Sequence, residues 1–209
     1  MQERIEGIAT GGDASTASRR GRREMPPTAR GGHDPSECIS ALQKAIRRGD
    51  EDGALHWAVE LEMSGFGEWV FRRLRVIASE DVGLAEPGIA SEVGALYTAW
   101  TDLRKKKDDR QEPWRLMLIH ATLLLARARK SRIVDHALIY AYSDTERREI
   151  PDVALDKHTL AGKKRGRGWE HFWTQGTLLA DPDTGELNQG SLPDPYREQA
   201  EAATMEQAR

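Results

Sequence analysis

The chain has 209 residues, 38% of them hydrophobic, which is enough for one ordinary domain with tails and too little for two large domains. Its 31 lysines and arginines against 34 aspartates and glutamates give a net charge of −3. This balance argues against a polycationic DNA coat but leaves local basic patches open. The single cysteine, Cys38, excludes an internal disulfide framework and a cysteine-rich zinc fold. No apolar run reaches the ~18 residues of a membrane helix and no signal-peptide core is present, so we expect a cytoplasmic protein with no membrane partner.

Residues 1–33 are rich in glycine, serine, threonine and arginine and hold few apolar side chains. Such a segment buries too little surface to offset its chain entropy, so a disordered tail is predicted. Its arginines could contact phosphate. A solvated tail, or a start codon assigned upstream of the true domain, is at least as good an interpretation.

The folded part is predicted to begin in the segment Asp34-Pro35-Ser36-Glu37. Aspartate can cap a helix, proline suits the first helical position, and a glutamate three residues after the cap completes the signature. Apolar residues then recur at helical spacing, and further helices start near Asp50, Gly67, Pro87, Pro113 and Ser131. The charged run 104–110 is predicted as a loop. The predicted core positions are Leu42, Ile46, Leu55, Leu61, Leu74, Ile77, Leu123 and Leu138.

No stretch alternates apolar and polar residues over the length of a strand, so no sheet is predicted. The short connections favour an all-α bundle or array of about six to eight helices. We expect one helical domain over residues 34–178. Residues 181–209 hold seven acidic and two basic side chains, and 179–209 is therefore predicted to be an acidic, mostly irregular tail with one terminal helix at most.

Sequence motifs for catalysis are weak. No GxxxxGK[ST] phosphate loop is present. His56 and Glu60 stand four residues apart on one predicted helix, but two ligands are too few for a metal site and a surface pair is favoured. His158 and His171 lack a partnered nucleophile. We therefore predict no catalytic, cofactor or metal residue and no enzymatic activity.

Three blocks of sequence carry a family resemblance. They are SALQKAIRR at 40–48, continuing to Ala54-Leu55-His56-Trp57, then RRLRVIASEDVGLAEP at 72–87, and LARARKS at 125–131. They resemble the C-terminal region of the MgsA/RarA AAA+ ATPases, bacterial relatives of the Werner-helicase-interacting protein. Those proteins are clamp-loader-like and are tied to stalled replication forks and recombination. The resemblance covers about residues 36–178, and its middle block is the most specific.

Full-length members of that family place a nucleotide-binding module before this region. Here a polar segment of 33 residues precedes it, and the Walker motifs, sensors and arginine finger of the module are absent. The resemblance therefore implies the family's helical oligomerisation region standing alone, without ATPase activity. It also implies a homotetramer and leaves room for a separate AAA+ ATPase subunit as partner.

Six of the 13 aromatic residues are tryptophans, a residue type enriched in interface hot spots. We consider three of them as oligomer-interface candidates, with core packing as the favoured alternative: Trp57, Trp69 and Trp100.

Basic residues form two candidate contacts with nucleic acid. Four basic residues lie among glycines directly before Trp169: Lys163, Lys164, Arg165 and Arg167. Basic side chains followed by aromatic side chains are the combination that holds single strands of nucleic acid. The arginine cluster that includes Arg72 and Arg73 is the second candidate. Solvated or salt-bridged surfaces remain the alternative, and the acidic tail could mask the first patch. Glu80 and Asp81 are expected to be solvated or capping.

Three functions follow from these observations. The first is a non-catalytic assembly module related to replication-fork maintenance, which contacts DNA or a partner ATPase. The second is a sequence-nonspecific nucleic-acid-binding protein. The third, a small enzyme that uses His158, His171 or the pair of His56 and Glu60, has the least support.

Overall fold

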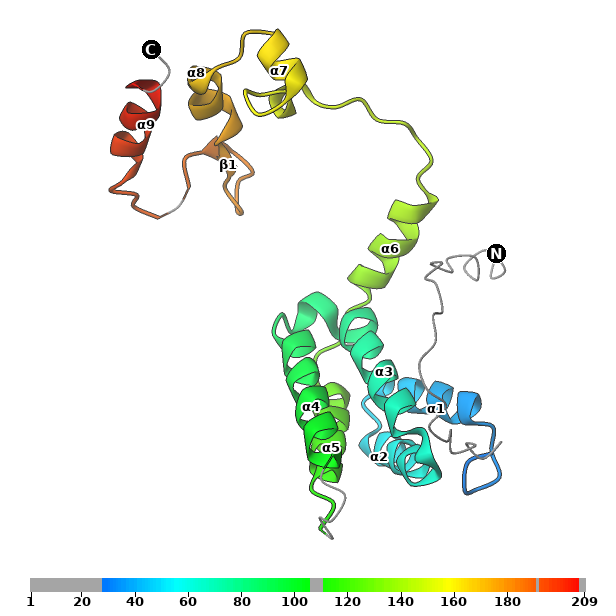
Figure 1. Cartoon of the computed structure of the whole chain (residues 1–209). Helices are drawn as coiled ribbons and strands as arrows, with labels where there is room; N and C mark the ends of the chain where they lie inside the picture. Colours follow the sequence, from blue (N-terminus) through cyan, green and yellow to red (C-terminus); the bar gives the residue numbers. More distant parts are fainter. Residues whose placement is uncertain (1–27, 106–110, 191, 207–209) are drawn as a thin grey trace, which may run out of the picture. The chain divides into compact units, whose positions relative to one another are not determined.

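The computed structural model describes residues 28–105, 111–190 and 192–206 (Figure 1). Internal contacts divide the chain into a first unit, Met1–Asp144, and a second unit, Thr145–Arg209. The division differs from the predicted single domain over residues 34–178. Residues 145–150 have no regular secondary structure and are exposed.

Helices make up the fold, as the sequence predicts. In the first unit they are α1 (Pro35–Arg48), α2 (Glu51–Leu61), α3 (Gly67–Ile77), α4 (Ile89–Arg104), α5 (Trp114–Arg127) and α6 (Ile133–Ser143). The second unit holds α7 (Leu160–Lys164), α8 (Trp169–His171) and α9 (Arg197–Glu206). The predicted absence of a sheet is wrong in one small respect, because β1 (Leu179–Ala180) and β2 (Leu187–Asn188) form an antiparallel ladder that pairs Leu179 with Asn188 and Ala180 with Leu187.

The predicted helix starts are confirmed where side chains cap them. Asp34 accepts a hydrogen bond from the backbone N–H of Ser36 at 2.7 Å, and Asp50 accepts one from Gly53 at 3.0 Å. These caps satisfy backbone donors that the first helical turn leaves without partners. At the other end of α1, Gly49 adopts a φ of 72° and closes the helix in the left-handed conformation that glycine favours.

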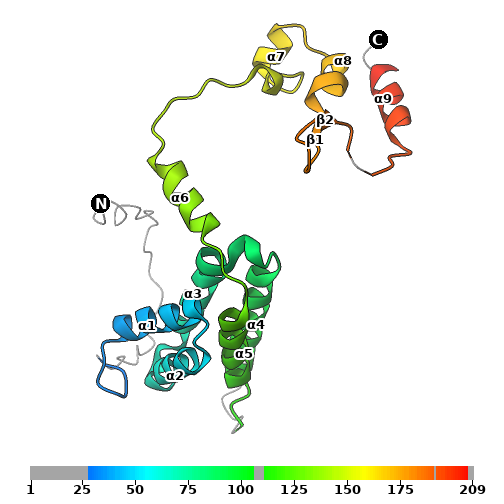
Figure 2. The ribbon, with the colours of Figure 1, turned by 180° about the vertical axis from the view of Figure 1, so that it is seen from behind.

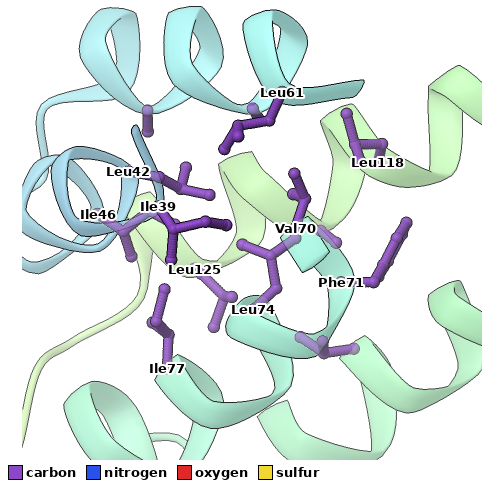
Figure 3. Close-up of a cluster of buried hydrophobic side chains, with 14 of the residues drawn as sticks. Ile39, Leu42, Ile46, Leu61, Val70, Phe71, Leu74, Ile77, Leu118 and Leu125 are labelled. Carbon is purple, nitrogen blue, oxygen red and sulfur yellow. The ribbon is translucent and has the colours of Figure 1, made fainter. Parts of the chain in front are cut away.

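The core of the first unit lies between α1, α2, α3, α4 and α5, and Figure 3 shows part of it. Most of the predicted core positions are confirmed, since Leu42, Ile46, Leu61, Leu74 and Ile77 are fully buried. Two further predicted core positions, Leu55 on α2 and Leu123 on α5, are only half-buried. The prediction for Leu138 is wrong, because 55% of this residue is exposed on α6.

Trp100 also belongs to this core and is no longer an interface candidate. Its side chain is fully buried, and its ring centroid lies 4.9 Å from that of Phe71. Gly67 faces the indole so closely that a Cβ there would lie 2.8 Å from a ring carbon. A tryptophan enclosed in this way cannot reach a second molecule.

The ordered structure begins before Asp34, so the predicted tail is wrong for residues 28–33. Ala29 is buried, and the backbone N–H of Arg30 donates to Ser64 Oγ at 2.9 Å. The N–H of Gly31 donates to Glu60 Oε1 at 2.6 Å. The turn is held because side chains near the end of α2 accept its backbone donors. Residues 1–27, and 106–110 of the predicted loop, lie outside the described residues.

Candidate nucleic-acid and assembly interfaces

The four clustered basic residues of the second unit are two lysines, Lys163 and Lys164, and two arginines, Arg165 and Arg167, and the two pairs differ in their contacts. Arg165 Nη1 lies 2.6 Å from Asp152 Oδ1, and Arg167 binds the same carboxylate and the carbonyl oxygen of Leu155. These contacts lower the pKa of Asp152, first through the hydrogen bond from Arg167 and then through the charges of Arg167 and Arg165. The two arginines therefore join the segment after α7 to residues 152–155.

Lys163 and Lys164 are the free half of the cluster. Both are exposed, and no carboxylate among the described residues forms an ion pair with either of them. An exposed ammonium on a flexible stem can meet a phosphate at little structural cost. Of the four predicted bases, these two remain available to nucleic acid.

Gly162 is required by the local packing of this stretch. Thr159 Oγ1 caps α7 by accepting from the N–H of Gly162 at 3.0 Å. A Cβ on Gly162 would lie 1.8 Å from the carbonyl oxygen of Asp156, so only glycine fits. The close backbone approach that Gly162 permits is therefore an approach to Asp156 of the same chain.

Trp169 is half-buried and already has partners. The Lys157 ammonium lies 3.3 Å from the centroid of its ring, and Phe172 meets it edge-on at 5.5 Å. His158 also lies edge-on, at 6.3 Å. Sequence reasoning missed Lys157, because a lysine twelve residues before a tryptophan gives no spacing signal. Its position adds a cation to the face that carries Trp169.

The acidic tail contacts Trp173 through its helix α9. Trp173 Nε1 donates to Thr204 Oγ1 on α9 at 2.9 Å, and the Arg197 guanidinium lies 5.6 Å from the Trp173 ring. In the part of the chain that the structure describes, no acidic residue of α9 pairs with Lys163 or Lys164. The predicted masking of the lysines remains a prediction.

A second candidate surface lies on α3, and we call it the α3 face. It is a shallow hollow of about 330 Å³ lined by Ile39, Trp69, Arg72, Arg73 and Val76. Arg72 is exposed, Arg73 donates to Gln43 Oε1 at 3.2 Å, and Trp69 is 43% exposed. The structure therefore brings together an indole predicted as an interface residue and two arginines predicted to bind nucleic acid.

Trp57 is partly covered by its own chain. It packs against the core, and the rings of His33 and His56 meet it edge-on at 5.8 Å and 4.8 Å. Since Glu60 binds the backbone of Gly31, it does not pair with His56 in a metal site. Among the described residues, no three potential ligands gather around a common point.

His158 of the second unit contacts aromatic rings and a carboxylate. His158 Nδ1 lies 2.9 Å from Asp156 Oδ2, and hydrogen bonds from His158 lower the pKa of this carboxyl group. The ring of His158 packs edge-on against Phe172 at 5.2 Å. These contacts fix the orientation of the His158 ring within a small cluster of packed side chains.

The prediction that Asp81 is solvated or capping is wrong. Its side chain is fully buried on the π-helical turn η2 (Ala78–Val82). Oδ1 accepts from Arg47 Nε at 2.6 Å, and Oδ2 accepts from Gln43 Nε2 at 2.9 Å. The contact with Asp81 is also the largest cause of the raised pKa of Arg47. Glu80, half-buried beside it, accepts from Arg47 at 3.0 Å.

α6 is the most exposed apolar element of the first unit. None of its side chains is buried, and Figures 1 and 2 show most of the helix beyond α1–α5. Its exposed large apolar residues are Ile133, Leu138, Ile139, Tyr140 and Tyr142, each between 55% and 78% exposed. A helix that is apolar all round is normally covered by other protein. In the described chain no helix has the length and apolar content to cross a membrane.

Comparison with known proteins matches this chain to one family. The family described as MgsA AAA+ ATPase C terminal matches residues 48–178. Replication-associated recombination protein A of Bacillus subtilis is 33% identical over 165 residues, which are 77% of this chain and 36% of that protein. The protein of the same name from Escherichia coli K12 is 33% identical over 141 residues, 65% of this chain and 30% of that protein.

A eukaryotic relative matches as well. ATPase WRNIP1 of Dictyostelium discoideum is 27% identical over 169 residues, 80% of this chain and 18% of that protein. The chain thus spans about a third or less of the length of these relatives. The match to the family covers more than half of the chain and includes most of the first unit. The chain therefore belongs to the family of the MgsA AAA+ ATPase C-terminal region.

Proposed function

We propose that this chain is a non-catalytic assembly module for replication-associated recombination, which self-associates through α6. The observation that carries the proposal is the exposed apolar surface of this helix. Its five large apolar residues leave on the order of 500 Å² open, at about 100 Å² each. Soluble monomers rarely expose a contiguous apolar surface of more than a few hundred Å² without an interaction that uses it.

The size of this surface is compatible with an interface between copies. A standard interface buries about 800 Å² on each partner, and the roughly 500 Å² of exposed apolar side chains on α6 would supply more than half of that area. The resemblance to the MgsA/RarA family implies a homotetramer, and closed symmetric oligomers are the common form of self-association. Contact with a separate AAA+ ATPase subunit, or with DNA, would then be organised by the assembly.

The molar mass of the full chain tests this proposal. We expect light scattering after size exclusion to give a mass four times 23.4 kDa that resists high salt, because apolar contacts are not screened. The double variant Leu138→Lys/Tyr140→Lys changes two sides of α6 and should give 23.4 kDa. Leu116→Lys, at a residue 67% exposed on α5, is the matched control and should keep the wild-type mass. A wild-type monomer at every concentration would exclude the proposal.

Sequence-nonspecific binding of nucleic acid is the second candidate. The observation in its favour is the α3 face, where Trp69 lies beside Arg72 and Arg73. Exposed rings stack on bases while cations meet phosphates. Lys163 and Lys164 offer two further contacts.

Salt dependence distinguishes this candidate. Log affinity for single strands should fall with log salt by roughly 0.7 for each phosphate contact. Arg72→Glu and Lys163→Glu/Lys164→Glu should each weaken binding and reduce the slope, whereas Arg48→Glu, at an exposed arginine that belongs to neither surface, serves as control. Arg165 and Arg167 are unsuitable for this test because they hold Asp152. Affinity that does not respond to salt would exclude phosphate binding.

A further inference from the structure

One side of α6 forms an apolar strip that begins at the bundle and runs out into solvent. Val134, Leu138 and Tyr142 are spaced by four residues and therefore lie on the same side of the helix. Val134 is half-buried, Leu138 is 55% exposed and Tyr142 is 78% exposed. The strip thus becomes more exposed along the helix, from Val134 to Tyr142.

A hollow of about 600 Å³ lies beside the beginning of this strip. It is lined by Arg72, Arg75, Val76, Ser79, Glu80, Ala90, Val134, Asp135 and Leu138. The Arg75 guanidinium lies 5.2 Å from the ring of Tyr97, whereas Arg72 is exposed and forms no ion pair with the described residues. Its two carboxylates, Glu80 and Asp135, pair with Arg132. The hollow is therefore partly apolar, and Arg72 is a cation in it that forms no ion pair among the described residues.

The start of α6 is held firmly against the bundle. The N–H of Ser131 donates to the carbonyl oxygen of Asp81 at 2.9 Å, and Arg132 Nη2 lies 3.5 Å from Glu80 Oε1. Val134 packs so closely on Gly83 that a Cβ there would lie 2.9 Å from its Cγ2. These contacts hold the strip and the hollow in one arrangement before any partner arrives.

We propose that α6 of a second copy packs antiparallel on this strip, about a two-fold axis at Leu138. The proposal rests on the self-association proposed above and names the surface that carries it. A two-fold axis there places Leu138 against Leu138 of the second copy. It places Val134 against Tyr142 of the second copy, because the two positions lie four residues on either side of the axis. The contact is isologous, so each copy fills the hollow of the other.

Charge favours the antiparallel direction. The last carbonyls of a helix carry a partial negative charge, and the antiparallel pair brings this end of one α6 to the hollow where Arg72 lies. The ring of Tyr142 arrives at the same place, where its face can meet the guanidinium of Arg72. A parallel pair would instead bring the two negative ends together, away from the arginines.

Cross-linking of full-chain variants, each with one added cysteine, tests whether the two α6 helices run antiparallel. Cys38 is only 1% exposed, so the unsubstituted chain gives the background with a short bismaleimide. Leu138→Cys should cross-link to a dimer by itself. Val134→Cys and Tyr142→Cys should cross-link strongly only when the two variants are mixed. Equal self-cross-linking of Tyr142→Cys alone would indicate a parallel pair and overturn the proposal.

Arg72 supplies an independent test of the hollow. Arg72→Glu should raise the dissociation constant of the pair about tenfold, because it places a carboxylate against the negative end of the second helix. Arg48→Glu reverses an exposed charge outside the hollow and should leave it unchanged. Self-association that persists without cross-linking at Leu138 would overturn the antiparallel pair alone. A chain that stays monomeric would overturn the proposed function as well.

Discussion

Arg47 Nε donates to Asp81 Oδ1 at 2.6 Å, which joins α1 to η2 across 34 residues of sequence. The carboxylate has no exposure to solvent, while 30% of the arginine side chain remains exposed. Gln43 adds a second donor to the same carboxylate. A buried charge of this kind is tolerated because its oxygens are hydrogen-bonded. The contact also supports α6, since the backbone of Asp81 accepts from Ser131.

Removing only the cation from this pair should be strongly destabilising. We expect Arg47→Met to lower the free energy of unfolding by about 3–5 kcal/mol, because Asp81 would remain buried without its charge partner. Urea denaturation of the full chain measures the change. Arg48→Ala, at the exposed neighbour, is the control and should stay within about 0.5 kcal/mol. The double variant Arg47→Met/Asp81→Leu should recover much of the lost free energy of unfolding. An equal free energy of unfolding for the single variant Arg47→Met and the double variant would contradict this account.

The tryptophans should separate into core and surface residues. Trp100→Ala removes a fully buried ring, and the resulting cavity should cost about 3–5 kcal/mol. Trp69→Ala removes a ring that is 43% exposed on the α3 face and should cost less than about 1 kcal/mol. Chemical denaturation of the two variants compares these losses directly. Equal losses would show that Trp69 is as important to the core as Trp100.

Gly162 should be intolerant of any side chain. Gly162→Ala would bring a Cβ to 1.8 Å from the backbone oxygen of Asp156, so the backbone of the second unit must move. We expect overpacking to cost about 3 kcal/mol or more and to raise amide exchange across α7. Gly168→Ala is the matched control, because nothing lies within 4 Å of a Cβ at that position. Unchanged exchange in Gly162→Ala would contradict the described packing.

The ion pairs of Asp152 predict loss of stability in acid. The pKa of this carboxyl group lies below the ordinary aspartate value of 3.8, chiefly because Arg167 donates a hydrogen bond to it. A group with a lowered folded-state pKa stabilises the fold fully above its unfolded value and loses this contribution as the pH falls through the folded value. NMR titration should therefore place the Asp152 midpoint below 3.8 in the wild type.

Replacing the donor tests the cause. Arg167→Gln should move the Asp152 midpoint upward, while Lys164→Gln, which removes an unpaired charge nearby, should have a much smaller effect. A wild-type midpoint at or above 3.8 would show that the arginines do not bind this carboxylate in solution.

The features that sequence predicts correctly depend on neighbours a few residues apart. Asp34 and Asp50 cap helices because each accepts from an N–H two or three residues further on. Leu42 and Ile46 face the core because one helix presents both to the same side. The family blocks extend over the same elements, which is why the all-α class and the family both follow from sequence.

The errors concern contacts between distant residues. Leu138 has the spacing of a core residue, but 55% of it is exposed on α6. Asp81 looks like a solvated partner of Glu80 until α1 brings Arg47 and Gln43 to it. Spacing along one helix identifies an apolar or charged side of that helix. It does not identify what packs there.

By itself, the sequence determined the helix starts, the all-α class and the family, because caps, apolar periodicity and motif order are local properties of the chain. Only the tertiary structure decided which of several similar residues serve which purpose. Lys163 and Arg167 carry the same charge four residues apart, yet the first is exposed and the second binds Asp152. Trp69 and Trp100 differ in the same way. The physical reason is that burial and ion pairing depend on residues brought together by folding, and helical spacing carries no record of them.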